Sequence, residues 1–170
     1  ISISAAGILN FTSSPDYETK TSYTAIVTAS DGTNSTTQDI TVNIINVNDV
    51  APAITSAESF SVEENQISIS TITATDADGD DLAFTISGSE LVITSVGVLT
   101  FAVAPDYETK TSYTATVTVS DGVNSVTQEI TVNVTNVNDN SPIITSSNEY
   151  SLEENTTEVG QATATDSDGD

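Results

Sequence analysis

The chain contains no cysteine, histidine, methionine or tryptophan, and two lysines are the only basic side chains among its 170 residues. Without cysteine no disulfide can stabilise the fold, and without histidine or cysteine the commonest general bases and nucleophiles of enzymes are missing. Acidic residues number 25, which gives a formal net charge of -23. Because nucleic acids and anionic membranes bind basic surfaces, neither is expected as a partner of this segment, and no enzymatic activity is expected either.

Hydrophobic residues make up 36% of the chain, and most of them are β-branched residues that alternate with polar ones. Alternation with a period of two indicates strands that bury one face, and no run shows the 3.6-residue period of a helix. Strong acidity alone would permit disorder, but this regular pattern favours a folded core. We therefore expect an all-β fold.

The sequence repeats itself without gaps after 90 residues, so that the segment Asp16-Tyr17-Glu18 returns as Asp106-Tyr107-Glu108. Such a period indicates a tandem array of small domains. We expect residues 1–49 to be the C-terminal part of a first repeat and residues 50–139 to be a complete second repeat. Residues 140–170 would then be the N-terminal part of a third repeat.

The complete repeat is predicted to contain about seven strands. The first begins at Phe60, and the others cover residues 67–75, 82–86, 91–93, 98–101, 113–119 and 126–134. Turn signals such as Asp121-Gly122 separate them. Short, regularly spaced strands of this kind indicate a Greek-key β-sandwich, and the repetition predicts sandwiches joined end to end.

A short linker, residues 46–52 and again 136–142, lies between the last predicted strand of a repeat and a proline that ends the strand pattern. Both linkers are dense in side-chain and backbone oxygens and contain no aromatic or basic residue. Oxygens of this kind are the ligands of hard cations, and a small domain without disulfides commonly needs a staple such as a metal. Calcium is therefore the first hypothesis.

Further motifs recur in a fixed order around the linkers. They are a glutamate before asparagine (Glu64, Glu154), an Asp-x-Asp loop (Asp76 and Asp78; Asp166 and Asp168), an Asp-x-Glu (Asp16 and Glu18; Asp106 and Glu108), and an aspartate after a long strand (Asp31, Asp121). With these motifs and the Asn-Asp-x-x-Pro linker, essentially the whole chain resembles tandem cadherin-type repeats such as those of bacterial extracellular surface proteins. The resemblance implies that these residues meet at the junctions between repeats and bind calcium there.

The resemblance assigns two sets of ligands, one at each junction. The first junction would use Asp16, Glu18, Asn46, Asn48, Asp49, Asp76, Asp78 and Asp121; the second would use Glu64, Asp106, Glu108, Asn136, Asn138, Asp139, Asp166 and Asp168. The carbonyl groups of Val47 and Val137 are expected as further ligands. Two or three Ca2+ ions per junction are expected, because Asn46 and Asn136 stand where the family usually has aspartate and bring no charge.

Each motif taken alone has a simpler interpretation. Residues 76–80 could form only a solvated polar turn, and an EF-hand is disfavoured because Ser87 stands at position twelve and no helix flanks the loop. The Asp-x-Glu motif could be only a polar strand end. Their recurrence together at one period favours the metal interpretation.

Three functions follow in order of support. The first is a calcium-rigidified structural spacer of a long extracellular adhesin or filament, whose partners are neighbouring repeats of the same chain and other copies in a filament. The second is a carbohydrate- or protein-binding module, which is disfavoured because aromatic residues are only 5% of the chain and mostly occupy alternating, core-facing positions. An enzyme is the third. We expect an extracellular or cell-surface location.

Overall fold

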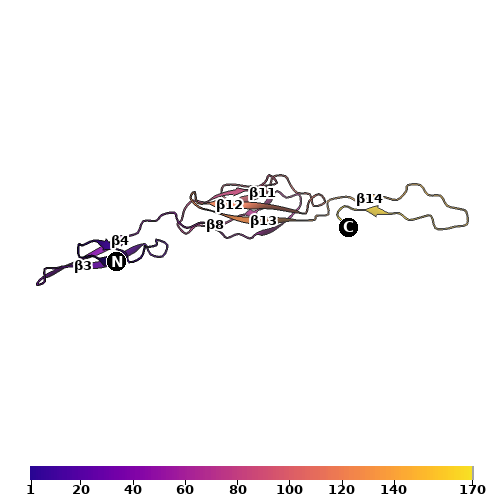
Figure 1. Ribbon diagram of the computed structural model, residues 1–170. Coiled ribbons are helices and arrows are strands. Elements are labelled where there is room, and N and C mark those ends of the chain that lie inside the picture. Colours follow the sequence, from indigo (N-terminus) through magenta and orange to yellow (C-terminus); the bar gives the residue numbers. More distant parts are fainter. Residues whose placement is uncertain (170) are drawn as a thin grey trace.

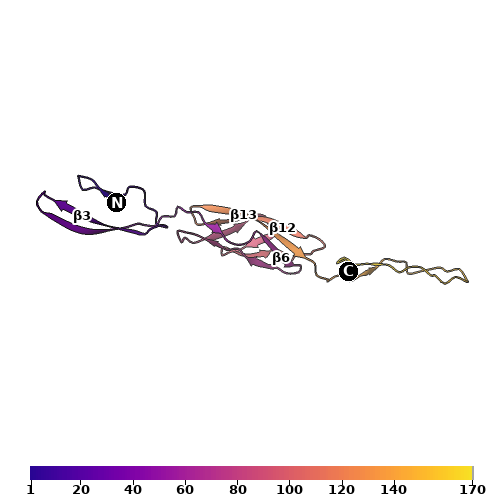
Figure 2. The same cartoon turned by 90° about the horizontal axis from the view of Figure 1, so that it is seen from below.

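The computed structural model describes residues 1–169, and three parts follow one another in a row (Figures 1 and 2). The hairpin of β3 (Ser22–Ser30) and β4 (Ser35–Asn43) lies at one end, a complete sandwich lies in the middle, and residues 140–169 run outward and back at the other end. Residue 170, the last of the predicted third repeat, lies outside the described residues. The expected all-β fold is confirmed, and residues 1–169 contain no helix that is long and apolar enough to cross a membrane.

The middle part is a sandwich of two sheets. Its strands are β5 (Ala53–Ile54), β6 (Ser59–Glu63), β7 (Ser68–Thr71), β8 (Ala74–Thr75), β9 (Ala83–Ile86), β10 (Leu91–Ile93), β11 (Val98–Phe101), β12 (Ser112–Ser120) and β13 (Ser125–Thr135). One sheet has the order β6-β13-β12-β9 and the other has the order β10-β11-β7. The pair β12 and β13 is antiparallel from Ser112 opposite Asn133 to Ser120 opposite Ser125, and β6 pairs with β13 in parallel.

The core of the sandwich follows from the alternation of the strands. Residues 115, 117 and 119 of β12 and 130, 132 and 134 of β13 point to one side and are buried, whereas the threonines and the asparagine between them lie on the outer face. Leu99 and Phe101 of β11 cover these side chains from the second sheet, together with Ile72 and Leu91. The aromatic rings of this repeat belong to the same core, because Phe60, Phe84, Tyr107 and Tyr113 all pack against it.

One predicted strand is interrupted. Residues 67–75 were expected to form a single strand, but the structure divides them into β7 and β8, with the buried Ile72 between them. The amide of Ile72 donates to the carbonyl of Gly97 at 2.8 Å, and β8 then pairs with β5 in a separate ladder. β5 lies before the first predicted strand, which begins at Phe60, and was not predicted. The middle repeat therefore contains nine strands where about seven were expected.

The two flanking parts contain fewer strands. The first has β1 (Ser2–Ile3), β2 (Leu9–Asn10) and the β3–β4 hairpin, and the last has β14 (Ile143–Ile144) paired with β15 (Ala164–Thr165). Residues 149–153, the counterparts of β6, form no strand. In the middle repeat β6 depends on β13, and residues 140–169 contain no counterpart of β13 with which this segment could pair.

We predict that Gly97→Ala destabilises the middle sandwich strongly. A Cβ atom at Gly97 would lie 2.3 Å from the carbonyl oxygen of Ile72, and the residue has a φ of +89°. Gly88→Ala is the matched control, because Gly88 has a φ of +81° but open space around it. The control should cost about 1–2 kcal/mol from backbone strain alone, and Gly97→Ala should cost clearly more in urea unfolding. Equal costs would show that the contact with Ile72 is unimportant.

Candidate metal centres at the repeat junctions

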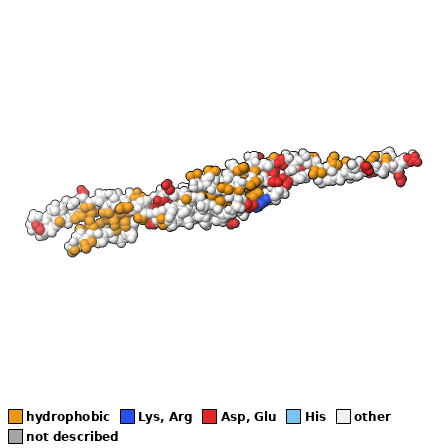
Figure 3. Space-filling model, turned by 90° about the horizontal axis from the view of Figure 1, so that it is seen from above, with side chains coloured by type: hydrophobic (Ala, Val, Ile, Leu, Met, Phe, Trp, Pro, Cys, Tyr) orange, Lys and Arg blue, Asp and Glu red, His pale blue; other side chains and the backbone are white. Residues whose placement is uncertain are grey.

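Acidic side chains gather at both ends of the central sandwich, where the linkers join it to its neighbours (Figure 3). At the first junction, carboxylate oxygens of Glu18, Asp49 and Asp78 lie within 4.8 Å of one another. Carboxylate oxygens of Asp76, Asp78 and Asp80 form a second group with the same spacing. Because Asp78 belongs to both groups, the first junction offers two adjacent sites that share one carboxylate.

The first linker is fastened to the repeat that follows it. The side-chain nitrogen of Asn46 donates to the carbonyl of Asp78 at 2.7 Å, and the amides of Asp49 and Val50 donate to Asp78 Oδ2 at 3.1 and 2.9 Å. The loop itself is closed by Asp76, whose Oδ1 accepts the amides of residues 78 and 79. These bonds place the linker oxygens against the Asp-x-Asp loop without help from a cation.

Three oxygens at this junction are buried and accept no hydrogen bond. They are Asn46 Oδ1, Asp76 Oδ2 and Asp78 Oδ1. A buried carboxylate or amide oxygen without a partner is costly, and a hard cation is a partner that would satisfy several such oxygens at once. The residues present therefore fit a calcium ion at the first junction.

The other residues assigned to the first junction are near it but have local partners. Asp16 accepts the amides of Glu18 and Thr19 and the hydroxyl of Thr19, so its carboxylate closes its own turn. Asn48 donates to the carbonyl of Asp121 at 3.3 Å, which brings Asp121 to this junction as expected. The side chain of Val47 is exposed.

Asp121 is buried, yet its carboxylate is well supplied with donors. Its Oδ1 accepts the amides of Val123 and Asn124, and its Oδ2 accepts the side chain of Asn124. Burial acts to raise the pKa of Asp121, but the hydrogen bonds from Asn124, Val123 and Asn48 outweigh it and lower the pKa below its usual value. Asp121 is therefore held charged at the junction.

The second junction brings four carboxylates together. Oxygens of Glu64, Glu108, Asp139 and Asp168 lie within 4.8 Å of one another. Glu64 is only 2% exposed, and its two oxygens accept the amides of Val137 at 2.8 Å and Tyr107 at 2.7 Å. A buried carboxylate thus ties the second linker to the repeat that precedes it.

The remaining contacts of the second linker repeat those of the first. Asn136 donates to the carbonyl of Asp168 at 2.8 Å, and the amides of Asp139 and Asn140 donate to Asp168 Oδ2. Asp166 accepts the amide of residue 168, as Asp76 accepts that of residue 78. Asp106 closes its own turn through Thr109, and Asn138 occupies the linker position equivalent to Asn48.

Sequence reasoning missed several polar residues at the junctions. Asn65 donates to Asp139 Oδ2 at 2.6 Å, and Asn124 donates to Asn48 Oδ1 at 3.0 Å. Asn140 donates to Glu108, Asp139 and Asp168, and Asp80 completes the second group at the first junction. The one available signal was the Glu-Glu-Asn segment, which recurs at residues 153–155 and contains Asn65 beside the predicted ligand Glu64.

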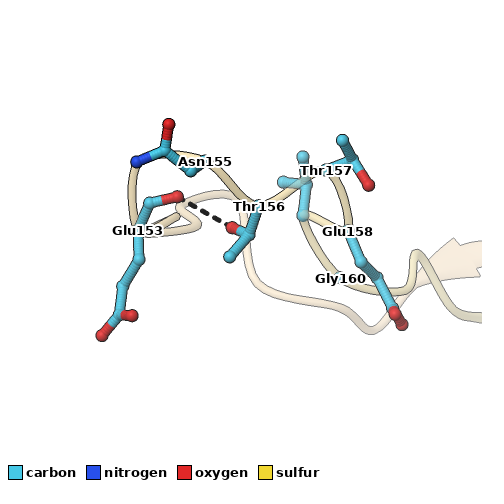
Figure 4. Close-up of a pocket in the computed structure, with 7 residues that line it drawn as sticks. Glu153, Asn155, Thr156, Thr157, Glu158 and Gly160 are labelled. Atoms are coloured by element: carbon cyan, nitrogen blue, oxygen red, sulfur yellow. Dashed lines mark hydrogen bonds between the residues drawn. The ribbon is translucent and has the colours of Figure 1, made fainter.

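The loop that begins at Glu153 near the C-terminus is equivalent to the turn of the middle repeat that contains Glu64 and Asn65 (Figure 4). Glu153 and residues 155–160 line a shallow hollow, and the hydroxyl of Thr156 donates to the carbonyl of Glu153 at 2.8 Å. Within residues 1–169, the carboxylates of this loop join none of the acidic clusters. The clusters found among residues 1–169 all lie at the two junctions.

Two carboxylates of the second junction, Glu108 and Asp168, differ in their affinity for protons. Partial burial raises the pKa of Glu108, and a hydrogen bond from its own backbone lowers it by less. The charges of Glu64 and Asp168 raise the pKa further. The side chain of Asn140 lowers the pKa of Asp168, and a hydrogen bond with Glu108 contributes to this. Of these two carboxylates, Glu108 therefore holds a proton more readily than Asp168.

Comparison with known proteins gives one family match. A family model described as the bacterial Ig domain matches residues 48–135, just over half of the chain. Among curated proteins, chitinase A of Pseudoalteromonas piscicida is 34% identical over 123 residues, which cover 71% of this chain and 15% of that protein. Cadherin EGF LAG seven-pass G-type receptor 2 of Homo sapiens is 31% identical over an alignment of 183 residues with gaps, which covers 97% of this chain and 6% of that protein.

Solved structures with a similar fold contain cadherin repeats. The protocadherin gammaB7 EC3-6 cis-dimer matches with a TM-score of 0.74 and 24% identity over 89% of this chain and 45% of that chain. Human protocadherin-24 EC1-2 matches with a TM-score of 0.61 and 27% identity over 69% of this chain and 60% of that chain. The chain spans from 3% to 15% of the length of the curated relatives it matches. The likeness to these structures shows that the sandwiches are cadherin-like.

We predict that calcium binding at the second junction weakens as the pH falls. Because the pKa of Glu108 is raised above its ordinary value of 4.5, protons compete with the cation at pH values above 4.5, and binding should release protons there. Calorimetric titrations in buffers of different ionisation enthalpy, between about pH 7 and pH 5, would measure this release. Glu108→Gln should reduce the pH dependence, and an equal dependence in this variant would contradict the assignment.

Proposed function

Because the chain belongs to the bacterial Ig domain family and is built of tandem cadherin-like repeats, we propose that it has an adhesive or structural role as a calcium-rigidified spacer of a long extracellular adhesin or filament. The repeats are proposed to be residues 1–49, 50–139 and 140–170, since the linkers separate equivalent positions of the sequence. Neighbouring repeats and other copies in a filament are the proposed partners, and the location is extracellular or at the cell surface.

The observation that carries the calcium proposal is the group of buried, unpartnered oxygens at the first junction. They come from both sides of the contact, because Asn46 belongs to the linker whereas Asp76 and Asp78 belong to the following repeat. Glu18, from the preceding repeat, lies within 4.8 Å of Asp49 and Asp78. A cation at this point would therefore be bound by both repeats and by the linker between them.

Electrostatic repulsion explains why a cation would rigidify the junction. Two carboxylates about 4 Å apart repel by about 1 kcal/mol in water and by about 4 kcal/mol at the lower effective dielectric constant of a protein surface. In a chain with a formal charge of -23, no excess of basic side chains is available to offset this repulsion. Calcium, when bound, would supply positive charge and bridge the oxygens, so the binding free energy would favour one fixed arrangement of the repeats.

The residues assigned to the two junctions would have different roles. Carboxylates of Glu18, Asp49 and Asp78 at the first junction, and of Glu108, Asp139 and Asp168 at the second, would contact the cation directly. Asp16 and Asp106 orient the turn that carries the glutamate of their motif. Asn46 and Asn136 attach the linker to the following repeat, and their amide oxygens would be further ligands.

A carbohydrate- or protein-binding module is less well supported. Flat aromatic surfaces commonly bind sugars, but the rings of the middle repeat are used in packing. Phe101 and Tyr113 make an edge-to-face contact with ring centroids 5.0 Å apart, and Lys110 lies 4.4 Å from the centroid of Tyr113. The match to a chitinase covers a small part of that enzyme, and this chain contains no histidine or cysteine, so a non-catalytic role is proposed here too.

We predict that calcium raises the melting temperature of the middle repeat. A ligand that binds only the folded state stabilises it by about 2.7 kcal/mol at a free concentration one hundred times its Kd. Magnesium should be a poor substitute, because it requires smaller and stricter octahedral coordination. Scanning calorimetry with calcium, with magnesium and with EGTA would measure this, and an unchanged melting temperature in EGTA would contradict the proposal.

We further predict that the junctions lose their fixed geometry when calcium is removed. Because the chain has no cysteine, cysteines introduced at the exposed positions Thr28 and Thr116 can carry spin labels across the first junction, and labels at Thr116 and Thr145 can span the second. Distance distributions should be narrow in calcium and broad in EGTA, while β-sheet circular dichroism persists. Changing Asp76 and Asp78 together to Ala should broaden only the first distribution. Narrow distributions in EGTA would show that protein contacts alone fix the junctions.

A further inference from the structure

The turn that follows β6 holds the second linker at two points. Glu64 Oε1 accepts the amide of Val137 at 2.8 Å, and the adjacent Asn65 donates its side-chain amide to Asp139 Oδ2 at 2.6 Å. Both bonds cross from the middle repeat to the linker, and neither requires a cation. Asp139 is one of the four carboxylates of the second acidic cluster, so the second bond acts on a proposed calcium ligand.

The backbone conformation of Asn65 directs its side-chain amide toward the linker. Asn65 has a φ of 62°, in the left-handed region that few residues other than glycine and asparagine adopt readily. Its backbone N–H donates to the carbonyl of Pro105 at 2.9 Å. Asn155, at the equivalent position, has a φ of 68° in a turn closed by the hydroxyl of Thr156, which donates to the carbonyl of Glu153. The conformation therefore belongs to the turn itself, and the bond to Asp139 is added where a linker is present.

We propose that Asn65 is a positioning residue for the second junction, one that fixes the carboxylate of Asp139 before any cation binds. This inference rests on the proposed calcium binding at that cluster. The amide of Asn65 occupies one site on Oδ2 of Asp139, and the side chain of Asn140 donates to Oδ1 at 2.9 Å. Each carboxylate oxygen can accept more than one bond, so a cation can still approach both.

Only asparagine satisfies the backbone and the contact together. Glycine would adopt the same φ but would offer no donor, and aspartate would place a second negative charge within hydrogen-bond distance of Asp139. An ordinary side chain such as alanine would add backbone strain to the loss of the bond. These differences allow the role of the amide to be separated from that of the backbone.

The test compares Asn65→Gly and Asn65→Asp with the parent chain in a background in which Asp76 and Asp78 are both changed to Ala, so that calcium binding reports the second junction. Asn65→Gly should lower the calcium affinity roughly tenfold or more, the usual loss when an outer-sphere partner of a metal ligand is removed. Asn65→Asp should lower it further because of the added repulsion. Gln66→Gly is the control for glycine in the same turn and should bind calcium like the parent.

Amide hydrogen exchange in EGTA provides a second measurement that does not depend on calcium. The amides of Val137 and Asp139 should exchange faster in Asn65→Gly than in the parent, while the melting temperature of the middle repeat in EGTA stays close to that of the Gln66→Gly control. If the parent binds no calcium, the proposed function fails, but faster exchange in the variant would still support positioning of the linker. Unchanged exchange, or a fall in melting temperature with unchanged calcium affinity, would overturn the role assigned to Asn65.

Discussion

The geometry of each junction depends on one carboxylate that accepts hydrogen bonds from the backbone of the linker. Asp78 Oδ2 accepts the amides of residues 49 and 50, and Asp168 Oδ2 accepts those of residues 139 and 140. Hydrogen bonds to a charged acceptor are stronger than those between neutral groups. Each linker is therefore hydrogen-bonded to the Asp-x-Asp loop of the repeat that follows it, and the acidic clusters lie around this contact.

At both junctions the repeat that precedes the linker contributes a glutamate to the acidic cluster. At the second junction, the buried Glu64 accepts a hydrogen bond from the linker amide of Val137, and the adjacent Asn65 donates one to Asp139. At the first junction, the described contacts place Glu18 beside Asp49 and Asp78, where like charges repel unless a cation lies between them. A cation at either junction would relieve this repulsion, since Glu108 stands in the second cluster where Glu18 stands in the first.

Most of the fold could be predicted from the alternation of residues, and the exceptions have local causes. The strands expected at residues 91–93 and 98–101 are present with the same bounds, and their buried residues Leu91, Leu99 and Phe101 belong to the core. The break at Ile72 could not be predicted, since it depends on the carbonyl of Gly97, which is distant in the sequence. Most of the predicted carboxylates lie in the clusters of residues 1–169, but Asp16, Asp106, Asp121 and Asp166 belong to none of them. Asn65 and Asn124 were missed because an asparagine that donates to these groups is not distinguished by residue type alone.

The asparagine that opens each linker can now be interpreted in terms of both of its polar atoms. Where the resemblance led us to expect aspartate, Asn46 uses its nitrogen to donate to the carbonyl of Asp78 and leaves its oxygen buried without a partner. A carboxylate at this position would place an oxygen against that carbonyl and would lose the bond. Asn136 makes the same contact with Asp168. Asparagine therefore contributes less charge to the cation than aspartate would, but it attaches the linker to the next repeat whether or not the cation is bound.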